Sequence, residues 1–290
     1  MRAGIEIAAA DDGSANEPAE ASGPGVTTPA DTPTEFAGTA ADYLRYRPPY
    51  PEALLVELRA RAGVSGSGVL LDLACGPGRV ALPMARHFAR VLAVDIEPEM
   101  IDVGRREAAR LGIANVEWRV QRAEELDLPA SSIELVTVGE AFHRLDQAQI
   151  VERALHWLTP RGAFATLAGE QVWRGRERWK RVLVDVVNRW TRGALGEPND
   201  AAWGGPVELL RGVGLSVCEG ECNVDIAWTC DSIVGLMYST SVASRRALGD
   251  DARALEDDLR RALLACEPSG RFLTRQRFAF TAGVKTRIGE

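Results

Sequence analysis

Acidic and glycine residues gather where two apolar runs of the chain end. The first run, Val69–Leu73, includes Asp72 and leads into the turn Ala74-Cys75-Gly76-Pro77-Gly78. The second run, Val91–Val94, is followed by Asp95. A buried parallel strand that turns sharply into a helix has this pattern, and such turns bind ligands at the carboxyl ends of the strands. The spacing from the turn to Asp95 is close to that at which a nucleotide-binding βαβ unit places an acid for a ribose.

A third apolar run, Ile133–Val138, leads through Gly139 to side chains that can move protons. Glu140 and His143 both follow it closely. Because a histidine titrates near neutral pH, His143 can accept a proton from a hydroxyl or an amine, and Glu140 is the other candidate base. The alternative for His143 is a structural hydrogen bond to a neighbouring loop.

Taken together, the glycine turn and the second acidic motif resemble one family. The segment Asp-Leu-Ala-Cys-Gly-Pro-Gly at 72–78, followed by Val-Asp-Ile-Glu-Pro-Glu-Met-Ile at 94–101, is similar to class I S-adenosylmethionine-dependent methyltransferases. The turn lacks the full G-x-G-x-x-G of a dinucleotide-binding fold, and Ala74 stands where the methyltransferase pattern has its first glycine. The resemblance covers about residues 40–168 well and the C-terminal third in outline. The alternative is an ordinary βαβ turn with unrelated acids.

The resemblance implies S-adenosylmethionine as the cofactor. Asp95 would accept hydrogen bonds from both ribose hydroxyls, and Asp72 would receive the amine directly or through water. Glycine backbone would approach the methionine part closely, and apolar side chains would face the adenine. For Glu124 the alternative is a place in a solvated loop. In this part of the chain the expected cofactor-binding residues are Asp72, Ala74, Gly76, Gly78, Asp95, Ile96, Met100, Ala123, Glu124 and Gly139.

Two further cofactor residues are expected upstream. Residues 43–51 are similar to the Tyr-x-x-Tyr-Arg-Pro-x-Tyr-Pro segment that precedes the first helix in many small-molecule methyltransferases. An arginine flanked by tyrosines can pair with the cofactor carboxylate while the rings cover the site, which would give these roles to Arg47 and Tyr46. The alternative is a proline-fixed arm that packs on the sheet.

The acceptor side is expected after the third run and in the helical region that follows. In the family, the segment at 139–146 lies nearest the transferred methyl group, so Glu140 and His143 are the catalytic candidates. Aromatic and apolar side chains suit a planar ligand, although the tryptophans could equally form the buried side of a helix. The expected substrate-binding residues are Phe142, Trp173, Trp179, Met237 and Tyr238. No metal site is expected, and the nucleobase or amide signature Asp/Asn-Pro-Pro-Tyr is missing after residue 138.

These motifs are carried by alternating strand-like and helix-like segments, which predict an α/β fold. Strands are expected at 69–74, 91–95, 116–120, 133–138 and 163–167, with helices at 51–61, 79–88, 98–110 and 146–158. Later strands are expected at about 215–228 and 277–284, and helices near 231–243 and 250–265. The family implies a Rossmann-like, seven-stranded and mostly parallel sheet with its last strand antiparallel. Residues 1–35 are expected to be a flexible tail, 36–290 one methyltransferase domain, and 170–212 a helical lid between strands five and six.

Composition limits the partners. The net charge of −7 argues against general affinity for nucleic acid or anionic membranes, and five scattered cysteines indicate reduced thiols in a cytoplasmic protein. The expected function is methyl transfer to N or O, with carbon as an option, of a small aromatic or polycyclic metabolite in a bacterial biosynthetic pathway such as that of an antibiotic. The expected oligomeric state is a monomer or homodimer. The alternatives are an RNA methyltransferase that uses the arginine-rich face of the 170–192 region, and a cofactor-binding module without activity.

Overall fold

Helices and strands alternate from Glu52 to Gly169, as the sequence predicts. The computed structural model describes residues 5–6, 35–195 and 205–286. Its strands are β1 (Ile5–Glu6), β2 (Val69–Leu73), β3 (Arg90–Asp95), β4 (Val116–Val120), β5 (Ile133–Gly139), β6 (Leu158–Gly169), β7 (Ser216–Thr229) and β8 (Arg271–Val284). Its α-helices are α1 (Ala40–Tyr46), α2 (Glu52–Ala62), α3 (Ala81–Ala85), α4 (Pro98–Arg110), α5 (Gln147–Trp157), α6 (Arg178–Thr191), α7 (Val207–Gly212), α8 (Cys230–Tyr238), α9 (Arg245–Leu248) and α10 (Ala252–Cys266). No described helix has the length and hydropathy needed to span a membrane.

The strands form one sheet in the order β1-β7-β8-β6-β5-β2-β3-β4. Strands β2 to β6 pair in parallel, and β8 is antiparallel to both of its neighbours. Apart from the two-residue β1, this is the predicted seven-stranded sheet with its last strand antiparallel, so the fold prediction is confirmed.

An apolar cluster covers each face of the sheet. Successive side chains of a strand point to opposite faces, so neighbouring residues belong to different clusters. In β2, Leu70 belongs to the apolar cluster on the α2 side and Leu71 to the cluster on the α5 side. Both leucines are fully buried. A strand that is buried on both faces lacks polar alternation, which explains the continuous apolar run in the sequence.

The predicted tail contains one short strand. Ile5–Glu6 pairs in parallel with Ile226 and Ala227 of β7, so these two residues join the edge of the sheet. Residues 1–4 and 7–34, on which the rest of that prediction falls, lie outside the described residues.

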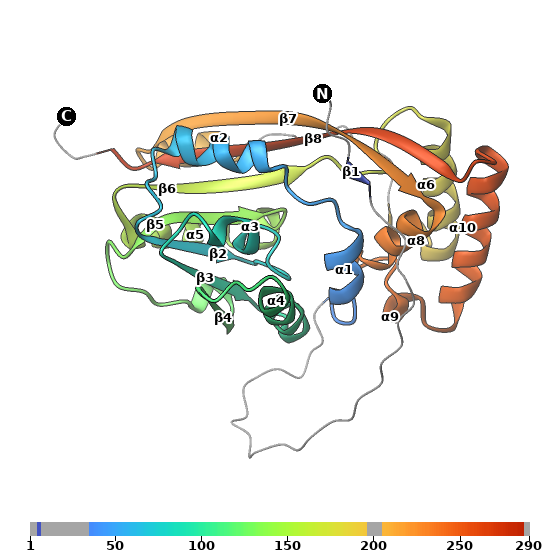
Figure 1. Cartoon of the computed structure of the whole chain (residues 1–290), viewed down its shortest axis with the longest axis horizontal. Helices are drawn as coiled ribbons and strands as arrows, with labels where there is room; N and C mark the ends of the chain where they lie inside the picture. Colours follow the sequence, from blue (N-terminus) through green and yellow to red (C-terminus); the bar gives the residue numbers. More distant parts are fainter. Residues whose placement is uncertain (1–4, 7–34, 196–204, 287–290) are drawn as a thin grey trace, which may run out of the picture.

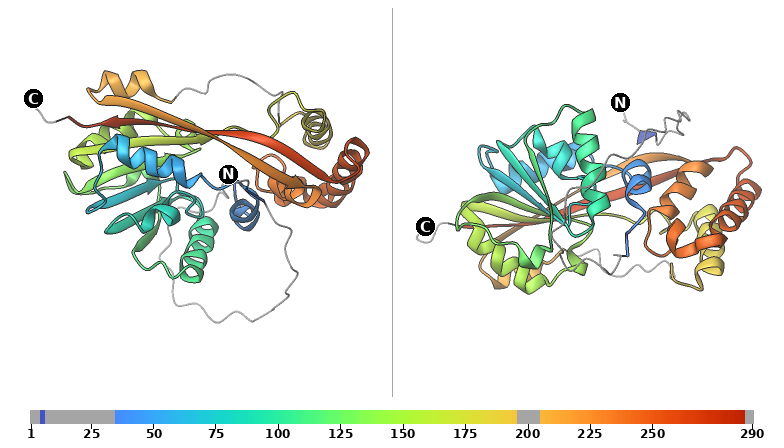
Figure 2. Two further views of the ribbon diagram at one scale, coloured as in Figure 1. Left: turned by 45° about the horizontal axis from the view of Figure 1, so that its top comes forward. Right: turned by 90° about the horizontal axis from the view of Figure 1, so that it is seen from below.

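A helical lobe, defined here as α6, α8, α9 and α10, lies beyond the end of the parallel strands (Figures 1 and 2). The antiparallel hairpin of β7 and β8 carries it: Arg271–Arg277 pairs with β7 past the last residue that pairs with β6. Helix α6 packs on α10, and α1 packs between α8 and α4. The predicted lid at 170–212 is therefore divided, because α6 joins the lobe whereas α7 packs on β7 and β8.

Asp72 holds the end of β2 to its surroundings. Its carboxylate accepts hydrogen bonds from the Ala81 backbone amide (3.0 Å) and the Thr137 hydroxyl (2.7 Å). The side chain is 1% exposed, and burial raises its pKa to about 7. The acid therefore joins β2 to the start of α3 and to β5 from beneath the glycine turn.

This burial predicts a pH-dependent stability. Since the folded state holds the Asp72 proton more tightly than the unfolded chain does, the stabilisation is complete below the unfolded pKa of about 3.8 and is lost as the pH rises to about 7. Relative to Asp72→Asn, the wild-type free energy of unfolding should fall over that interval by at most roughly 4 kcal/mol. Urea unfolding at several pH values measures this difference, and parallel curves for the two proteins would contradict it.

Candidate functional site

The turn after β2 requires left-handed backbone at three positions. The φ angles are +48° at Ala74, +55° at Gly76 and +89° at Gly78. A Cβ at Gly78 would lie 2.7 Å from the Trp118 ring, so this glycine permits packing beneath the turn. A Cβ at Gly76 would meet nothing closer than Tyr43, at 3.8 Å. Gly76 and Ala74 line a cavity of about 1430 Å³, whereas Gly78 and Asp72 do not, so the structure does not place these two beside a cofactor.

Asp95 ends β3 at the wall of the same cavity. One carboxylate oxygen accepts a hydrogen bond from the Gly76 amide (2.7 Å) and the other from the Glu97 amide (2.8 Å). Burial raises the pKa of Asp95, whereas these two amides oppose the shift. Because a carboxylate has about four acceptor sites, each oxygen can still accept one hydroxyl. The fixed orientation therefore fits the predicted role toward a ribose.

The residues expected around the adenine also line the cavity. Ile96 is 46% exposed although it is apolar, and Met100, Ala123 and Glu124 lie nearby in the lining. The exposed Ile96 follows Asp95 directly and offers an apolar surface that suits an adenine ring. The described residues at this end of the cavity thus fit S-adenosylmethionine.

Residues 43–51, called the arm here, differ from their predicted arrangement. Tyr46 packs on Gly235 of α8, where an added Cβ would lie 2.2 Å from its ring, and it does not line the cavity. Tyr43, one helical turn earlier, faces the cavity instead and lies under the Arg47 guanidinium at 4.2 Å. The sequence analysis missed Tyr43, although its i, i+4 spacing to Arg47 indicates a shared face.

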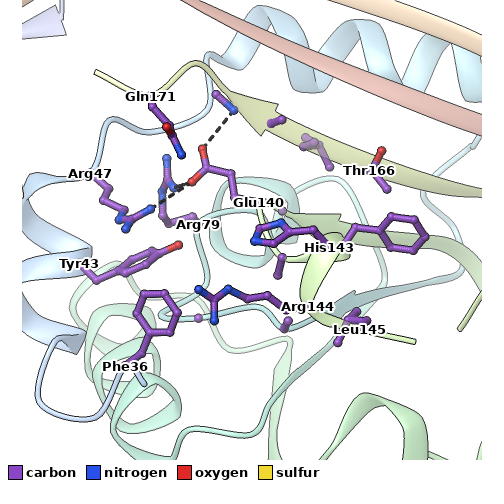
Figure 3. Close-up of a pocket in the computed structure, with 18 of the residues that line it drawn as sticks. Phe36, Tyr43, Arg47, Arg79, Glu140, His143, Arg144, Leu145, Thr166 and Gln171 are labelled. Carbon is purple, nitrogen blue, oxygen red and sulfur yellow. Dashed lines mark hydrogen bonds and ion pairs between the residues drawn. The ribbon is translucent and has the colours of Figure 1, made fainter. Parts of the chain in front are cut away.

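Glu140 is bound by cationic and backbone groups on both sides (Figure 3). One of its oxygens lies 3.3 Å from Arg47 and 3.3 Å from Arg79, and the other accepts a hydrogen bond from the Gly169 amide at 3.1 Å. Arg47 also donates to the hydroxyl and the carbonyl of Ser239. Both oxygens of Glu140 and the guanidinium of Arg47 thus have partners within the protein, although both residues line the cavity.

Arg79 is a second residue that the sequence analysis missed. Its guanidinium lies over the Tyr50 ring at 4.9 Å and donates to the Pro48 carbonyl in addition to Glu140. The side chain therefore fixes the arm against the glycine turn. In the sequence, its position directly after Gly78 was the only indication that it belongs to the site. That position does not reveal which way the side chain points.

His143 lines the cavity close to Glu140 (Figure 3). Burial and the neighbouring Arg144 guanidinium lower the pKa of His143, which favours the neutral imidazole, the form that can accept a proton. It makes no hydrogen bond to another described residue, in contrast to Glu140. The structural alternative for His143, a hydrogen bond to a neighbouring loop, therefore has no support in the described part of the chain.

Of the five expected substrate-binding residues, two line the cavity. Phe142 and Trp173 do so, whereas Trp179, Met237 and Tyr238 do not line it and are buried in the lobe. Trp179 packs on Phe272 with ring centroids 5.3 Å apart. Tyr238 donates a hydrogen bond to the Ala252 carbonyl, and burial raises its pKa to about 12. In helix α8 every residue from Ser232 to Tyr238 is buried, because α1 and α10 pack against it.

Comparisons with known proteins agree with this geometry. Residues 70–162 match the family described as a methyltransferase domain. An uncharacterized methyltransferase-like protein of Schizosaccharomyces pombe is 26% identical over 172 residues, which are 58% of this chain and 62% of that protein. The ubiquinone biosynthesis O-methyltransferase of Xylella fastidiosa is 36% identical over 104 residues, which are 35% of this chain and 42% of that enzyme. The chain thus spans about three fifths, or less, of the length of these relatives.

A solved structure shows the same fold over most of the chain. The YcgJ protein of Bacillus subtilis superposes with a TM-score of 0.52 at 18% identity, and the match covers 82% of this chain and 100% of that one. At this identity the likeness concerns the fold alone.

The two glycines of the turn should respond differently to alanine. Gly78→Ala should lower the free energy of unfolding by about 2–3 kcal/mol, because it adds left-handed strain to a clash with Trp118. Gly76→Ala should cost about 1 kcal/mol, since only strain is added. Thermal and urea unfolding of both variants test the order, and equal losses would contradict the assignment of Gly78 to packing.

Proposed function

We propose that this chain is a class I S-adenosylmethionine-dependent methyltransferase that transfers the methyl group of this cofactor to an O or N atom of a small aromatic metabolite. The match of residues 70–162 to a methyltransferase domain supports the reaction class. The observation that carries the proposal is the continuity of one cavity. It runs from Asp95 and Ile96, past Glu140 and His143, to Trp173.

The residues of this chain would bind the cofactor, orient the acceptor and exclude water from the cavity. The cofactor supplies a methyl group on a positively charged sulfur that is already activated for displacement. Asp95 and the Gly76 turn would hold one end, and the arm that Arg79 and Glu140 fix would close the cavity over it. Aligning the acceptor in a water-poor space accounts for a large part of such an acceleration. His143 would take the proton of the acceptor hydroxyl or amine.

Two features support a small aromatic acceptor. Phe142 and Trp173 are aromatic residues among those that line the cavity. The volume of about 1430 Å³ exceeds the roughly 300–1,000 Å³ typical of a single small-molecule site, which is what a cofactor and an acceptor together would need. The ubiquinone biosynthesis O-methyltransferase among the relatives favours a small biosynthetic acceptor, and the net charge of −7 disfavours RNA.

An acceptor screen with methyl-labelled S-adenosylmethionine tests the proposal. Simple phenols, naphthols, aryl amines and total RNA are incubated separately with the protein. Label on a small aromatic molecule supports the proposal and label on RNA would replace it. Cofactor binding without any labelled product would favour a binding module.

Asp95 is expected to dominate cofactor affinity. Removing it leaves two ribose hydroxyls without their charged acceptor, an interaction of about 1.5–3 kcal/mol. Asp95→Ala should therefore weaken S-adenosylhomocysteine binding about ten- to a hundredfold, as measured by calorimetry. Unchanged affinity in a folded variant would reject the assignment.

His143 and Glu140 are expected to behave differently as the two catalytic candidates. His143→Ala should lower single-turnover transfer about 10²-fold or more with little change in cofactor affinity. In the wild type the rate should rise with pH through a pKa below 6.5 and then level, because only neutral His143 accepts a proton. Glu140→Gln should retain a rate within about tenfold, since its amide oxygen can still accept from Arg47 and Arg79, although its NH2 group cannot accept from the Gly169 amide. The reverse pattern would make Glu140 the base, and near-wild-type rates in both would leave alignment as the whole mechanism.

A further inference from the structure

Lysine is almost absent from this chain. Lys180 and Lys285 are the only two among 34 basic residues, and both ammonium groups bind backbone carbonyls. Lys180 donates to the Arg174 carbonyl at 2.7 Å, and Lys285 donates to the carbonyls of Leu155 and Leu158 at 2.8 and 3.0 Å. A compact ammonium with three donors suits converging carbonyls better than a planar guanidinium does. Each ammonium group thus binds two acceptors: the Arg174 carbonyl and the Glu177 carboxylate for Lys180, and two carbonyls for Lys285.

Lys180 closes a tight loop before α6. Its side chain is 7% exposed, and Nζ also lies 2.9 Å from the Glu177 carboxylate. The loop wraps so closely that a Cβ at Gly175, whose φ is +123°, would lie 2.8 Å from Nζ. Helix α6 is itself anchored, because Trp179 packs on Phe272 of β8. The Lys180 ammonium therefore holds the Arg174 carbonyl in place by a hydrogen bond.

The segment that ends at Arg174 forms one wall of the cavity. Residues 171–174, called the acceptor wall here, all line it, and Trp173 is among them. The other end of the wall is also held, since the buried Gln276 amide donates to the Glu170 carbonyl at 2.7 Å. In Figure 3, Gln171 extends toward the group formed by Glu140, Arg47 and Arg79. Lys180 itself is not among the residues that line the cavity.

We propose that Lys180 is a positioning residue that selects the acceptor by fixing the acceptor wall, through its bonds to the Arg174 carbonyl and Glu177. The inference rests on the proposed function, because it assigns this wall to the acceptor half of the cavity. Loss of the ammonium frees the Arg174 carbonyl and lets Trp173 move. The cofactor end is built on β2 and β3 and should keep its affinity.

The test compares two matched variants, Lys180→Met and Lys285→Met. Each removes an ammonium bound to backbone carbonyls, but Lys285 lies at the opposite end of β8 from the lobe. Calorimetry measures the Kd of S-adenosylhomocysteine first, and then the Kd of 2-naphthol, a planar phenol, with S-adenosylhomocysteine saturating. Lys180→Met should weaken 2-naphthol binding at least tenfold and change S-adenosylhomocysteine binding less than twofold. Lys285→Met should leave both within twofold, whatever its effect on stability.

A second variant covers the case in which Lys180→Met does not fold. Gly175→Ala places a methyl group against the Glu177 carboxylate and the Lys180 ammonium without removing either, and it should weaken 2-naphthol binding in the same selective way. Equal weakening by Lys180→Met and Lys285→Met, or no weakening in either Lys180→Met or Gly175→Ala, would overturn the proposal. Wild-type protein that binds S-adenosylhomocysteine but not 2-naphthol would overturn it as well. Wild-type protein that does not bind S-adenosylhomocysteine would instead reject the proposed function.

Discussion

The ion pairs of Glu140 with Arg47 and Arg79 are the interaction on which the site depends. They join the loop after β5, the arm before α2 and the start of the α3 region, three segments that are far apart in sequence. One carboxylate between two guanidinium groups is stable in a partly buried place only when its remaining lone pairs are used, and the Gly169 amide uses one of them. The left-handed backbone at Glu140, with φ of +55°, shows that the fold accepts local strain to place this acid.

The same cluster links two parts of the molecule that have different tasks. Arg47 continues from Glu140 to Ser239 at the end of α8, so the arm contacts both the parallel sheet and the helical lobe. Tyr46 adds a second contact with α8, and the charged pair of Asp42 with Arg245 of α9 adds a third at 3.6 Å. Helix α1 and the arm therefore connect the lobe physically to the cofactor end of the cavity.

Local patterns predicted the parallel half of the fold well. The limits of α4 at Pro98 and Arg110 and of β4 at Val116 and Val120 agree with the sequence expectation, because proline at a helix start and apolar runs are local signals. Long-range packing was not predictable in the same way. Tyr46 and Tyr43 are equivalent in the motif, and only the docking of α1 on Gly235 decides which one faces the cavity. The burial of Met237 and Tyr238 was not predictable for a related reason, since the helices that bury them come later in the chain.

The hairpin of β7 and β8 extends past β6 before it reaches the lobe, and this has a consequence for how such a protein can diversify. Each added pair of residues per strand would move the lobe by about 7 Å along the strand direction and keep the same side chains on the same faces. The cofactor end would be unaffected, because it lies on strands at the other side of the sheet. A change in the length of this one hairpin, by natural insertion or by design, can therefore alter the size of the cavity and leave the cofactor end unchanged.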